Sequence, residues 1–520
     1  SFTIVEATSN GYFDDVKLEG KTLVNLFRDF SVSRPNGIGG ESYNKYTIQI
    51  KDDNSSSALR FEFKFKNNLR PSKYTIMLKA NSTITTSFKI DFLDSSNQLI
   101  REATKPSSTN FEYMDSFENI IDISTIRLYV NRGAVMTSSD IVTVSDIIIL
   151  EGDHTQNPPE YFEGLKSVGD GVDDIVVSSV SSNLYNSNAE IGTISISTGT
   201  DLTNSARIRT DFIPIENANN LLQSMYTANL VQVNTFFYNA DKEFIGKSGT
   251  LTGSYNLLNI PQNTKYVRTL YKLQSDADVS NEDVVTFDNS YMLTYDLDNT
   301  TYIPHKSNKK PILYYNPTTQ TWEKPVLREW DNIEKHDDGK YYYHKRSGEV
   351  VLNGTEQWTR AYTQAGNLNQ LYISKYDMIR VDDYSSRMVC DKLKVLISDG
   401  IAEEGITGYT DLANYPGENW IYINTAKSTA ELTEWLAANP TTVVYQQAQE
   451  EVYECINIDL ITYQGETNYI VNAGAIAPLS TLKVMCNITN VVRELQQKVS
   501  NLENYIQHVM IDALNNALDE

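Results

Sequence analysis

The sequence predicts a mainly β protein in which β-sandwich modules follow one another and a single long helix ends the chain. Short β-branched and aromatic runs, rich in the 33 tyrosines, alternate with polar turn residues, a pattern typical of strands. Two stretches repeat the same landmarks in the same order. The last stretch carries apolar residues at a heptad spacing. A length of 520 residues favours three or four domains, at about 150 residues each.

The first part of the chain is predicted to hold a lead-in segment and a first module. Residues 1–40 contain short strand-like pieces and a glycine-rich loop, which is typical of a docking segment. Residues 41–167 are predicted to form a β-sandwich. Phe61, Phe63 and Phe65 alternate with charged residues there, so one side of this strand is expected to be buried.

Residues 185–312 are predicted to be a second copy of the sandwich, joined to the first by an acidic, glycine-bearing and mobile linker at 168–184. The repeated landmarks are a strand–turn–strand segment, an arginine-bearing strand and a closing strand. They pair 92–100 with 237–245, 126–129 with 267–271, and 144–150 with 287–293.

Residues 313–470 are predicted to form a third β module, rich in tryptophan and tyrosine. Its one expected helix lies near 429–438, because Ser428 and Glu431 have the spacing of a capping box and Pro440 stops the helix. Residues 471–484 are expected to connect this module to the final helix.

Residues 485–520 are predicted to be an oligomerising, parallel coiled coil. Their apolar stripe is narrow and lasts about four heptads, so we expect it to be buried against copies of itself rather than against the body of the molecule. Val or Ile at a with Leu at d favours two strands, whereas Ile488 and Val509 at d shift the preference toward three. The stripe consists of Met485, Ile488, Val492, Leu495, Val499, Leu502, Ile506, Val509 and Ala513.

Composition excludes several classes of function. A net charge of −23 leaves no basic face for nucleic acid. The mean hydropathy is −0.39 and no apolar run approaches the roughly 18 residues of a membrane span, so no membrane insertion is expected. The opening residues do not have the pattern of a secretory signal. Three scattered cysteines and five histidines argue against a disulfide framework, a zinc site or another cofactor, and favour synthesis in a reducing cytosol.

Aromatic residues of the third module are candidates for stacking on sugar rings. Tyr341 and Tyr343 share one face of an expected hairpin and Tyr342 lies on the other. With Trp330 and Trp358 nearby, they are predicted to form a carbohydrate-binding platform; the alternative is cross-strand aromatic packing.

Acidic residues offer weaker candidates. Asp296 and Asp298 have oxygen ligands suited to calcium, but the spacing of an EF-hand is absent. The adjacent pairs 173–174 and 403–404 do not specify the separation across a groove that glycoside hydrolysis needs. No nucleophile elbow, zinc-protease or phosphate-loop motif occurs. The chain is therefore expected to have no catalytic residues and not to be an enzyme.

Three segments and the lead-in carry a family resemblance. Residues 148–168, with Glu-Gly-Asp-His-Thr-Gln-Asn-Pro-Pro-Glu-Tyr-Phe-Glu-Gly-Leu at their centre, resemble the closing motif of sandwich modules in tail fibre and baseplate proteins of phages infecting Gram-positive bacteria. Residues 330–358 and 435–446 resemble the same proteins, and 20–26 looks like their lead-in. The resemblance implies jelly-roll modules of the carbohydrate-binding type, usually assembled as homotrimers near the tail tip.

The resemblance also implies a location and partners. It implies a virion protein of the phage tail, made in the bacterial cytoplasm, that mediates host attachment by multivalent recognition of cell-surface carbohydrate. Its partners would be copies of itself (a homotrimer, or a dimer), other tail and baseplate proteins, and host cell-wall polysaccharide. Many receptor-binding proteins place the coil first, whereas here it is last. This keeps open a structural connector that carries a separate tip, beside a polysaccharide depolymerase.

Overall fold

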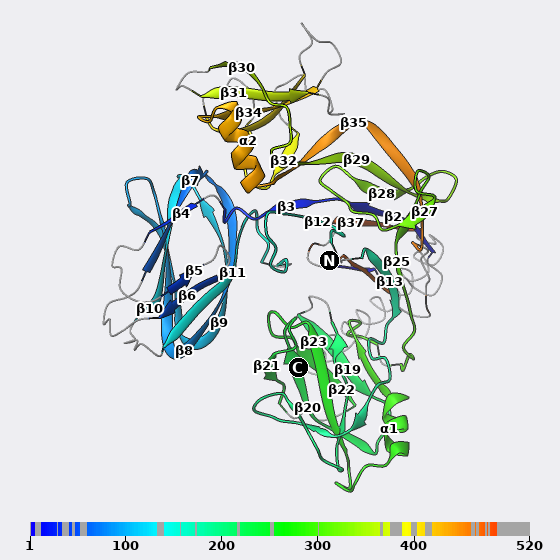
Figure 1. The fold of residues 1–520 in the computed structure, drawn as a ribbon. Coiled ribbons are helices and arrows are strands. Elements are labelled where there is room, and N and C mark those ends of the chain that lie inside the picture. Colours follow the sequence, from blue (N-terminus) through cyan, green and yellow to red (C-terminus); the bar gives the residue numbers. More distant parts are fainter. Residues whose placement is uncertain are drawn as a thin grey trace, which may run out of the picture.

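The computed structural model shows a mainly β chain arranged as two sandwich modules and a smaller unit around a central body (Figure 1). The two helices in the described part of the chain lack the length and apolar character of a membrane span. The described residues are 2–5, 12–28, 30–33, 41–43, 47–51, 60–132, 140–155, 158–171, 174–215, 219–249, 254–299, 301–363, 368–374, 387–396, 403–410, 419–458, 463, 467–473, 476 and 479–485.

The first module (blue to cyan in Figure 1) is built on two long, paired strands. The first half of β8 pairs with β11 and its second half with β10, and both halves contribute to one core. Phe63 and Phe65 are buried in this core, which confirms the predicted alternation for these two residues. The strands are β4 (Phe30–Ser33), β5 (Glu41–Tyr43), β6 (Thr47–Lys51), β7 (Arg60–Leu69), β8 (Ser72–Leu93), β9 (Leu99–Asn119), β10 (Ile123–Arg132) and β11 (Ile141–Glu151).

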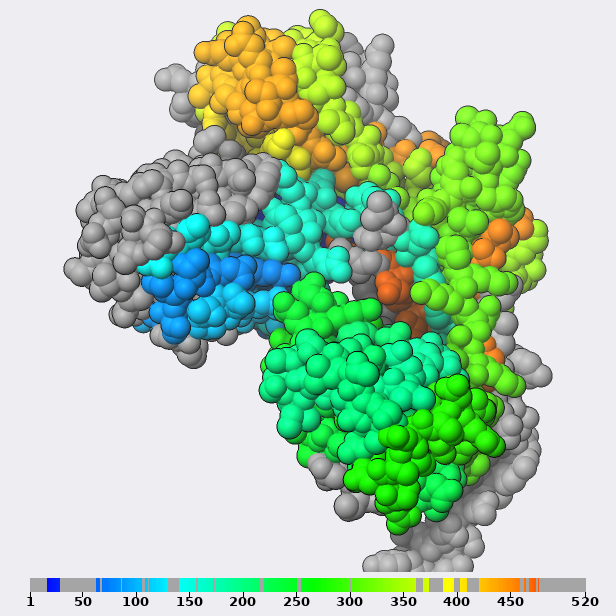
Figure 2. All heavy atoms as spheres, turned by 60° about the horizontal axis from the view of Figure 1, so that its bottom comes forward, coloured from blue at the N-terminus to red at the C-terminus, as the bar shows by residue number. Residues whose placement is uncertain are grey.

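The second module (green) forms a lobe of its own, in front in Figure 2. Two main sheets enclose a core rich in aromatic rings, with Tyr185, Phe287 and Tyr291 fully buried. Its elements are β14 (Glu190–Ile191), β15 (Thr193–Ile194), β16 (Asp201–Leu202), β17 (Ile208–Arg209), β18 (Ile213–Pro214), β19 (Asn220–Met225), β20 (Leu230–Tyr238), β21 (Phe244–Lys247), β22 (Tyr255–Asn259), β23 (Tyr266–Leu273), α1 (Asn281–Asp288) and β24 (Tyr291–Thr294).

The two modules share the turn that the sequence repeat identified. The side-chain oxygen of Asp94 accepts hydrogen bonds from the N–H groups two and four residues on, and Asn239 does the same in the second module. Asn97 and Lys242 occupy the left-handed region in the same place, each with φ of 61°. Ile126 and Val267 also pair with equivalent strand positions, Phe92 and Phe237.

A buried asparagine at the start of each module shows that the third pair of repeated segments, 144–150 and 287–293, is misaligned by one residue. The side-chain oxygen of Asn25 accepts a hydrogen bond from the N–H of Ile149, and that of Asn183 accepts one from the N–H of Leu293. Ile149 and not Leu150 is therefore the equivalent of Leu293. The second module also contains α1, which the sequence did not predict; it begins after the capping box of Ser280 and ends in a short turn before β24.

The central body brings together segments from both ends of the chain. In its eight-stranded sheet, β2 pairs with both β28 and β37. In a four-stranded sheet, β36 pairs with both β1 and β13. The strands are β1 (Phe2–Val5), β2 (Tyr12–Glu19), β3 (Thr22–Val24), β12 (Leu165–Ser167), β13 (Val176–Ser181), β25 (Ser307–Pro311), β26 (Leu313–Asn316), β27 (Thr321–Glu323), β28 (Asn332–Lys335), β29 (Tyr341–Leu352), β35 (Thr441–Ile456), β36 (Thr467–Asn472) and β37 (Leu479–Met485).

This pairing gives several predicted segments a different role. The lead-in at 1–40 supplies strands to the central body and β4 to the first module. The linker at 168–184 supplies β13, a central strand of its sheet. Met485, the first position of the expected coil, ends β37 opposite Tyr12. The remaining coil positions, Ile488 to Ala513, lie outside the described residues.

A smaller unit (yellow to orange) sits on the ends of the long strands β29 and β35 (Figure 1). Its α2 matches the predicted helix, and both hydrogen bonds of the predicted capping box between Ser428 and Glu431 are present. Its elements are β30 (Thr359–Thr363), β31 (Asn369–Ser374), β32 (Met388–Cys390), β33 (Gly405–Thr410), β34 (Asn419–Thr425) and α2 (Thr429–Ala438).

Candidate functional site: the outer face of the central sheet

The hairpin β28–β29 presents opposite faces to the core and to solvent. Its turn closes through hydrogen bonds between His336 and Lys340, with Gly339 at φ of 83°. As predicted, Tyr341 and Tyr343 point to one side of the sheet and Tyr342 to the other, since successive strand residues alternate.

The inward tyrosines are part of the core, which corrects the predicted sugar platform. Tyr341 is 8% exposed, and its phenolic oxygen accepts the N–H of Val16 at 3.2 Å. Tyr343 is 2% exposed and donates to the carbonyl of Val326 at 2.8 Å. Its ring packs against Tyr314, with 5.2 Å between centroids. Because neither ring has a free face, these residues pack across strands, as the alternative interpretation held.

The two tryptophans of the predicted platform do not join them. Trp358 is buried in the core of the smaller unit. Trp330 is half-buried beside the turn before β28, where its backbone N–H donates to the hydroxyl of Ser347. The four residues therefore do not form one exposed aromatic surface.

An exposed row of side chains instead crosses the outward face of this sheet. Tyr342 is paired with Glu334 on one side and with Glu454 on the other, and the Tyr314–Cys455 pair places Tyr315 next to Glu454. We call this set the outer row. From β27 to β2 it consists of Trp322, Tyr315, Glu454, Tyr342, Glu334 and Lys17.

Two aromatic rings begin the outer row. Trp322 is 45% exposed and Tyr315 is 39% exposed, and their centroids lie 5.5 Å apart. Neighbouring strands are about 4.8 Å apart, so the step from β27 to β29 spans about 14 Å. The row thus places Trp322 and Tyr315 at one end and Tyr342 at the other end of a length that accommodates several sugar rings, with the carboxylate of Glu454 between them.

The hairpin that carries these rings is fixed by one carboxylate. Glu323 accepts hydrogen bonds from Thr319, Asn316 and Tyr314, at distances between 2.6 and 3.1 Å. These bonds favour the ionised form and lower the pKa of Glu323 to about 2. Trp322, next to it, is therefore held on a rigid edge hairpin.

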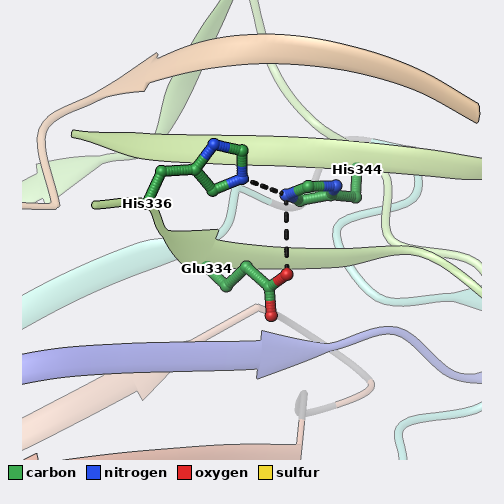
Figure 3. Close-up of side chains that lie close together, drawn as sticks. All are labelled: Glu334, His336 and His344. Carbon is green, nitrogen blue, oxygen red and sulfur yellow. Dashed lines mark hydrogen bonds and ion pairs between the residues drawn. The ribbon is translucent and has the colours of Figure 1, made fainter. Parts of the chain in front are cut away.

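Two histidines and a glutamate lie together beside the outer row (Figure 3). The Nε2 atoms of His336 and His344 are 2.8 Å apart, and the Nε2 of His344 is 3.6 Å from a carboxylate oxygen of Glu334. One atom from each of the three side chains lies within 4.8 Å of the other two. This arrangement has the atom types and spacing of a metal site.

Neighbouring side chains orient both imidazoles. The ring of His336 stacks on Tyr342 with 4.3 Å between centroids. His344, which is 6% exposed, has its Nδ1 atom 2.5 Å from Glu450. Arg346 holds the same carboxylate at 2.8 Å.

The acidic candidates from the sequence have structural roles. Asp296 accepts the N–H of Asp298 at 3.1 Å, which is a local turn, and the metal-type grouping found among the described residues does not include this pair. Glu403 pairs with Arg70 and Lys394. Glu404, its neighbour, accepts the N–H of Ala426.

A pocket of about 230 Å³ lies elsewhere, where the first module meets the smaller unit. Arg28 and Lys392 face Glu163 and Asp391 around it. The mixed charge gives it no clear preference for an anion or a cation.

Sequence reasoning missed the exposed row and the histidines for an identifiable reason. Glu334 lies on β28, His336 directly follows the end of this strand, and a turn centred on Asp338 brings His344 back beside them. That spacing was visible in the sequence. The prediction against a zinc site used the low number of histidines and not their positions in the hairpin.

Comparisons with known proteins found likeness in structure alone. No protein-family model matches the chain, and no curated protein does. The N-terminal cellulose-binding domain of a Cellulomonas fimi β-1,4-glucanase is 10% identical, with a TM-score of 0.20 over 26% of this chain and 95% of that one.

Two further neighbours are also carbohydrate-binding modules. A variant of a family 29 module is 10% identical, with a TM-score of 0.18 over 26% of this chain and 86% of its own. A family 4 module is 7% identical, with a TM-score of 0.17 over 27% of this chain and 95% of its own. Likeness at this level supports no conclusion about the ligand of this chain.

Proposed function

We propose that this chain is a non-enzymatic appendage of a phage tail that attaches the particle to its host by binding cell-surface carbohydrate. The observation that carries the proposal is the pair formed by Tyr315 and Trp322, two exposed rings on a rigid hairpin at the start of the outer row. Large, rigid and amphipathic side chains bind partners with little loss of conformational entropy. The sequence resemblance to tail fibre and baseplate proteins of phages infecting Gram-positive bacteria supplies the biological setting.

The ligand class follows from the surface chemistry. The aromatic faces suit the C–H faces of sugar rings, and the carboxylates of Glu454 and Glu334 accept hydrogen bonds from hydroxyl groups. A neutral or cationic glycan fits this surface better than a polyanion, because the chain carries a net charge of −23.

Binding to an array of bacterial cell-wall and capsular glycans tests this proposal. Trp322→Ala is expected to weaken binding of the full chain at least tenfold, or about 1.4 kcal/mol. Tyr255→Ala is a matched control, because Tyr255 is 46% exposed but lies on the second module. If Trp322→Ala binds like the natural chain, or if no glycan binds, the proposal is wrong.

We further propose that a parallel coiled coil after β37 holds three copies on one axis, which would raise the avidity of weak sugar contacts. The experiment is the mass in solution of the full chain beside a chain truncated after Met485. This cut retains β37 and its pairing with β2. A threefold mass for the full chain and a single mass for the truncated chain are expected, and a twofold mass would indicate the dimer.

Two other functions give different results in the same assays. A connector that carries a separate receptor-binding tip would bind no glycan. A depolymerase would release new reducing ends from wall polysaccharide, which sizing of the products would detect.

A further inference from the structure

We propose that Glu334, His336 and His344 form a binding site for Zn²⁺ on the outer face of the central sheet. The inference does not rest on the proposed function, because a metal ion can bind here whether or not a glycan does. It reverses the expectation, drawn from five scattered histidines, that the chain holds no zinc site.

The positions of the three ligand atoms suit a tetrahedral ion. Zinc binds histidine nitrogen and carboxylate oxygen at about 2.0–2.2 Å, so ligand atoms around it lie roughly 3.3 Å apart. The two Nε2 atoms are 2.8 Å apart, and the Nε2 of His344 is 3.6 Å from Glu334. These distances bracket the required one. The third pair of ligand atoms, on Glu334 and His336, lies within 4.8 Å, and His336 is exposed at the end of the hairpin, so its side chain has room to move onto the ion.

Glu450 and Arg346 prepare His344 as a ligand. An ionised Glu450 carboxylate has no proton to donate and can only accept a hydrogen bond. In their 2.5 Å contact, the proton is therefore on the Nδ1 atom of His344. In this tautomer a neutral ring presents the lone pair of its Nε2 atom toward His336 and Glu334, which lie beside that atom (Figure 3). A carboxylate behind a histidine is the usual partner of a zinc ligand, because it fixes the tautomer and makes the ring more basic. Arg346 keeps Glu450 in place.

The short contact between the two histidines also indicates what the ion replaces. Two imidazole nitrogens at 2.8 Å require a proton between them, since two lone pairs at that distance repel. A divalent cation can take the place of this proton and bring the carboxylate of Glu334 into the same shell.

Three protein ligands leave one position of a tetrahedral zinc open to water or to an oxygen of another molecule. The site reaches solvent, because His336 is exposed and the side chain of Glu334 is 35% exposed. A hard, oxygen-seeking cation such as Mg²⁺ is a poor match, since two of the three ligands are imidazoles.

Titration of the metal-free full chain with Co²⁺ and Zn²⁺ tests the proposal. We expect one Co²⁺ per chain with the visible absorption of tetrahedral coordination, and its displacement by one equivalent of Zn²⁺. His336→Ala, at an exposed position, should weaken affinity more than 100-fold without loss of fold. Glu450→Gln, which acts only through His344, should weaken it 10- to 100-fold.

His154→Ala is the matched control, because His154 is a histidine of the first module that contacts the carbonyl of Glu151. Its affinity for Co²⁺ should equal that of the natural chain. Failure of the natural chain to bind Co²⁺ or Zn²⁺, or unchanged binding by His336→Ala, would overturn the proposal. If His344→Ala does not fold, His336→Ala and Glu334→Gln still decide the outcome.

Discussion

Tyr341 and Tyr343 lie on one side of β29 and Tyr342 on the other, and the same type of side chain meets two different surroundings. The ring of Tyr343 packs against Tyr314 and Tyr453, and the oxygens of both inward tyrosines bond to the backbone. The ring of Tyr342 stacks on His336 instead, and its hydroxyl donates to Asp338 at 2.7 Å. One face of the hairpin thus stabilises the fold, and the other is available to a ligand or an ion.

The pKa shifts of these tyrosines have different physical causes on the two faces. Burial raises the pKa of Tyr343 well above its usual value, because the ionised phenol would lose its hydration. The pKa of Tyr342 is raised chiefly because its hydroxyl donates a hydrogen bond to Asp338. A cluster of adjacent tyrosines is therefore not one functional unit, since strand alternation assigns its members to opposite faces.

The sharpest test of this difference compares Tyr343→Ala with Tyr342→Ala. Loss of the buried ring of Tyr343 should cost about 4 kcal/mol of unfolding free energy for the central body, because it leaves a cavity in the core. Loss of the outward Tyr342 ring should cost less than about 1 kcal/mol. Hydrogen exchange read from peptides of β28 and β29 locates the effect. If the peptides of β28 and β29 are equally protected from hydrogen exchange in the two variants, the division of the hairpin into a core face and a ligand face is wrong.

A smaller effect is expected for Tyr341→Phe. This change keeps the ring but removes the oxygen that accepts the N–H of Val16, and β2 lies in the sheet that the two ends of the chain share. A buried donor without its partner costs about 1–2 kcal/mol. Exchange of the Val16 amide should accelerate, whereas Tyr342→Phe should leave it unchanged. If the Val16 amide exchanges at the same rate in both variants, its hydrogen bond to Tyr341 does not anchor β2.

Local signals in the sequence predicted local structure well. The capping box at Ser428 gave α2, and the alternation of Phe63 and Phe65 gave a half-buried strand. The turn after Phe92 recurs after Phe237 because Asp94 and Asn239 make the same side-chain bonds to the backbone. Each of these features depends on residues within a few positions of one another.

Features that depend on distant pairing could not be predicted in this way. Nothing near Val16 shows that β2 pairs with β37, more than 450 residues along the chain. Tyr341 and Tyr343 are buried in a core that they share with Val177, Tyr469 and Val471, on strands β13 and β36 of the four-stranded sheet, and that is a tertiary choice. The platform prediction failed here because composition cannot tell which face of a hairpin a second layer will cover.

The weakest expected effect concerns the edge hairpin that carries Trp322. The pKa of Glu323 is lowered from 4.5 to about 2, first by its hydrogen bond from Thr319 and then by those from Asn316 and Tyr314. A lowered pKa in the folded state means that the carboxylate contributes stability above pH 4.5. That contribution is lost progressively as the pH falls from 4.5 toward 2.

The fluorescence of Trp322, isolated by subtracting the Trp322→Phe variant, should therefore change between about pH 4.5 and about 2. In Glu323→Gln this change should disappear, because no titrating group remains at the turn. The size of the effect is small, since Glu323 is close to solvent and its interactions are screened. A titration of Trp322 that persists in Glu323→Gln would show that the hairpin is held by other contacts. The rigidity of the edge that carries Trp322 would then not depend on the ionised carboxylate of Glu323.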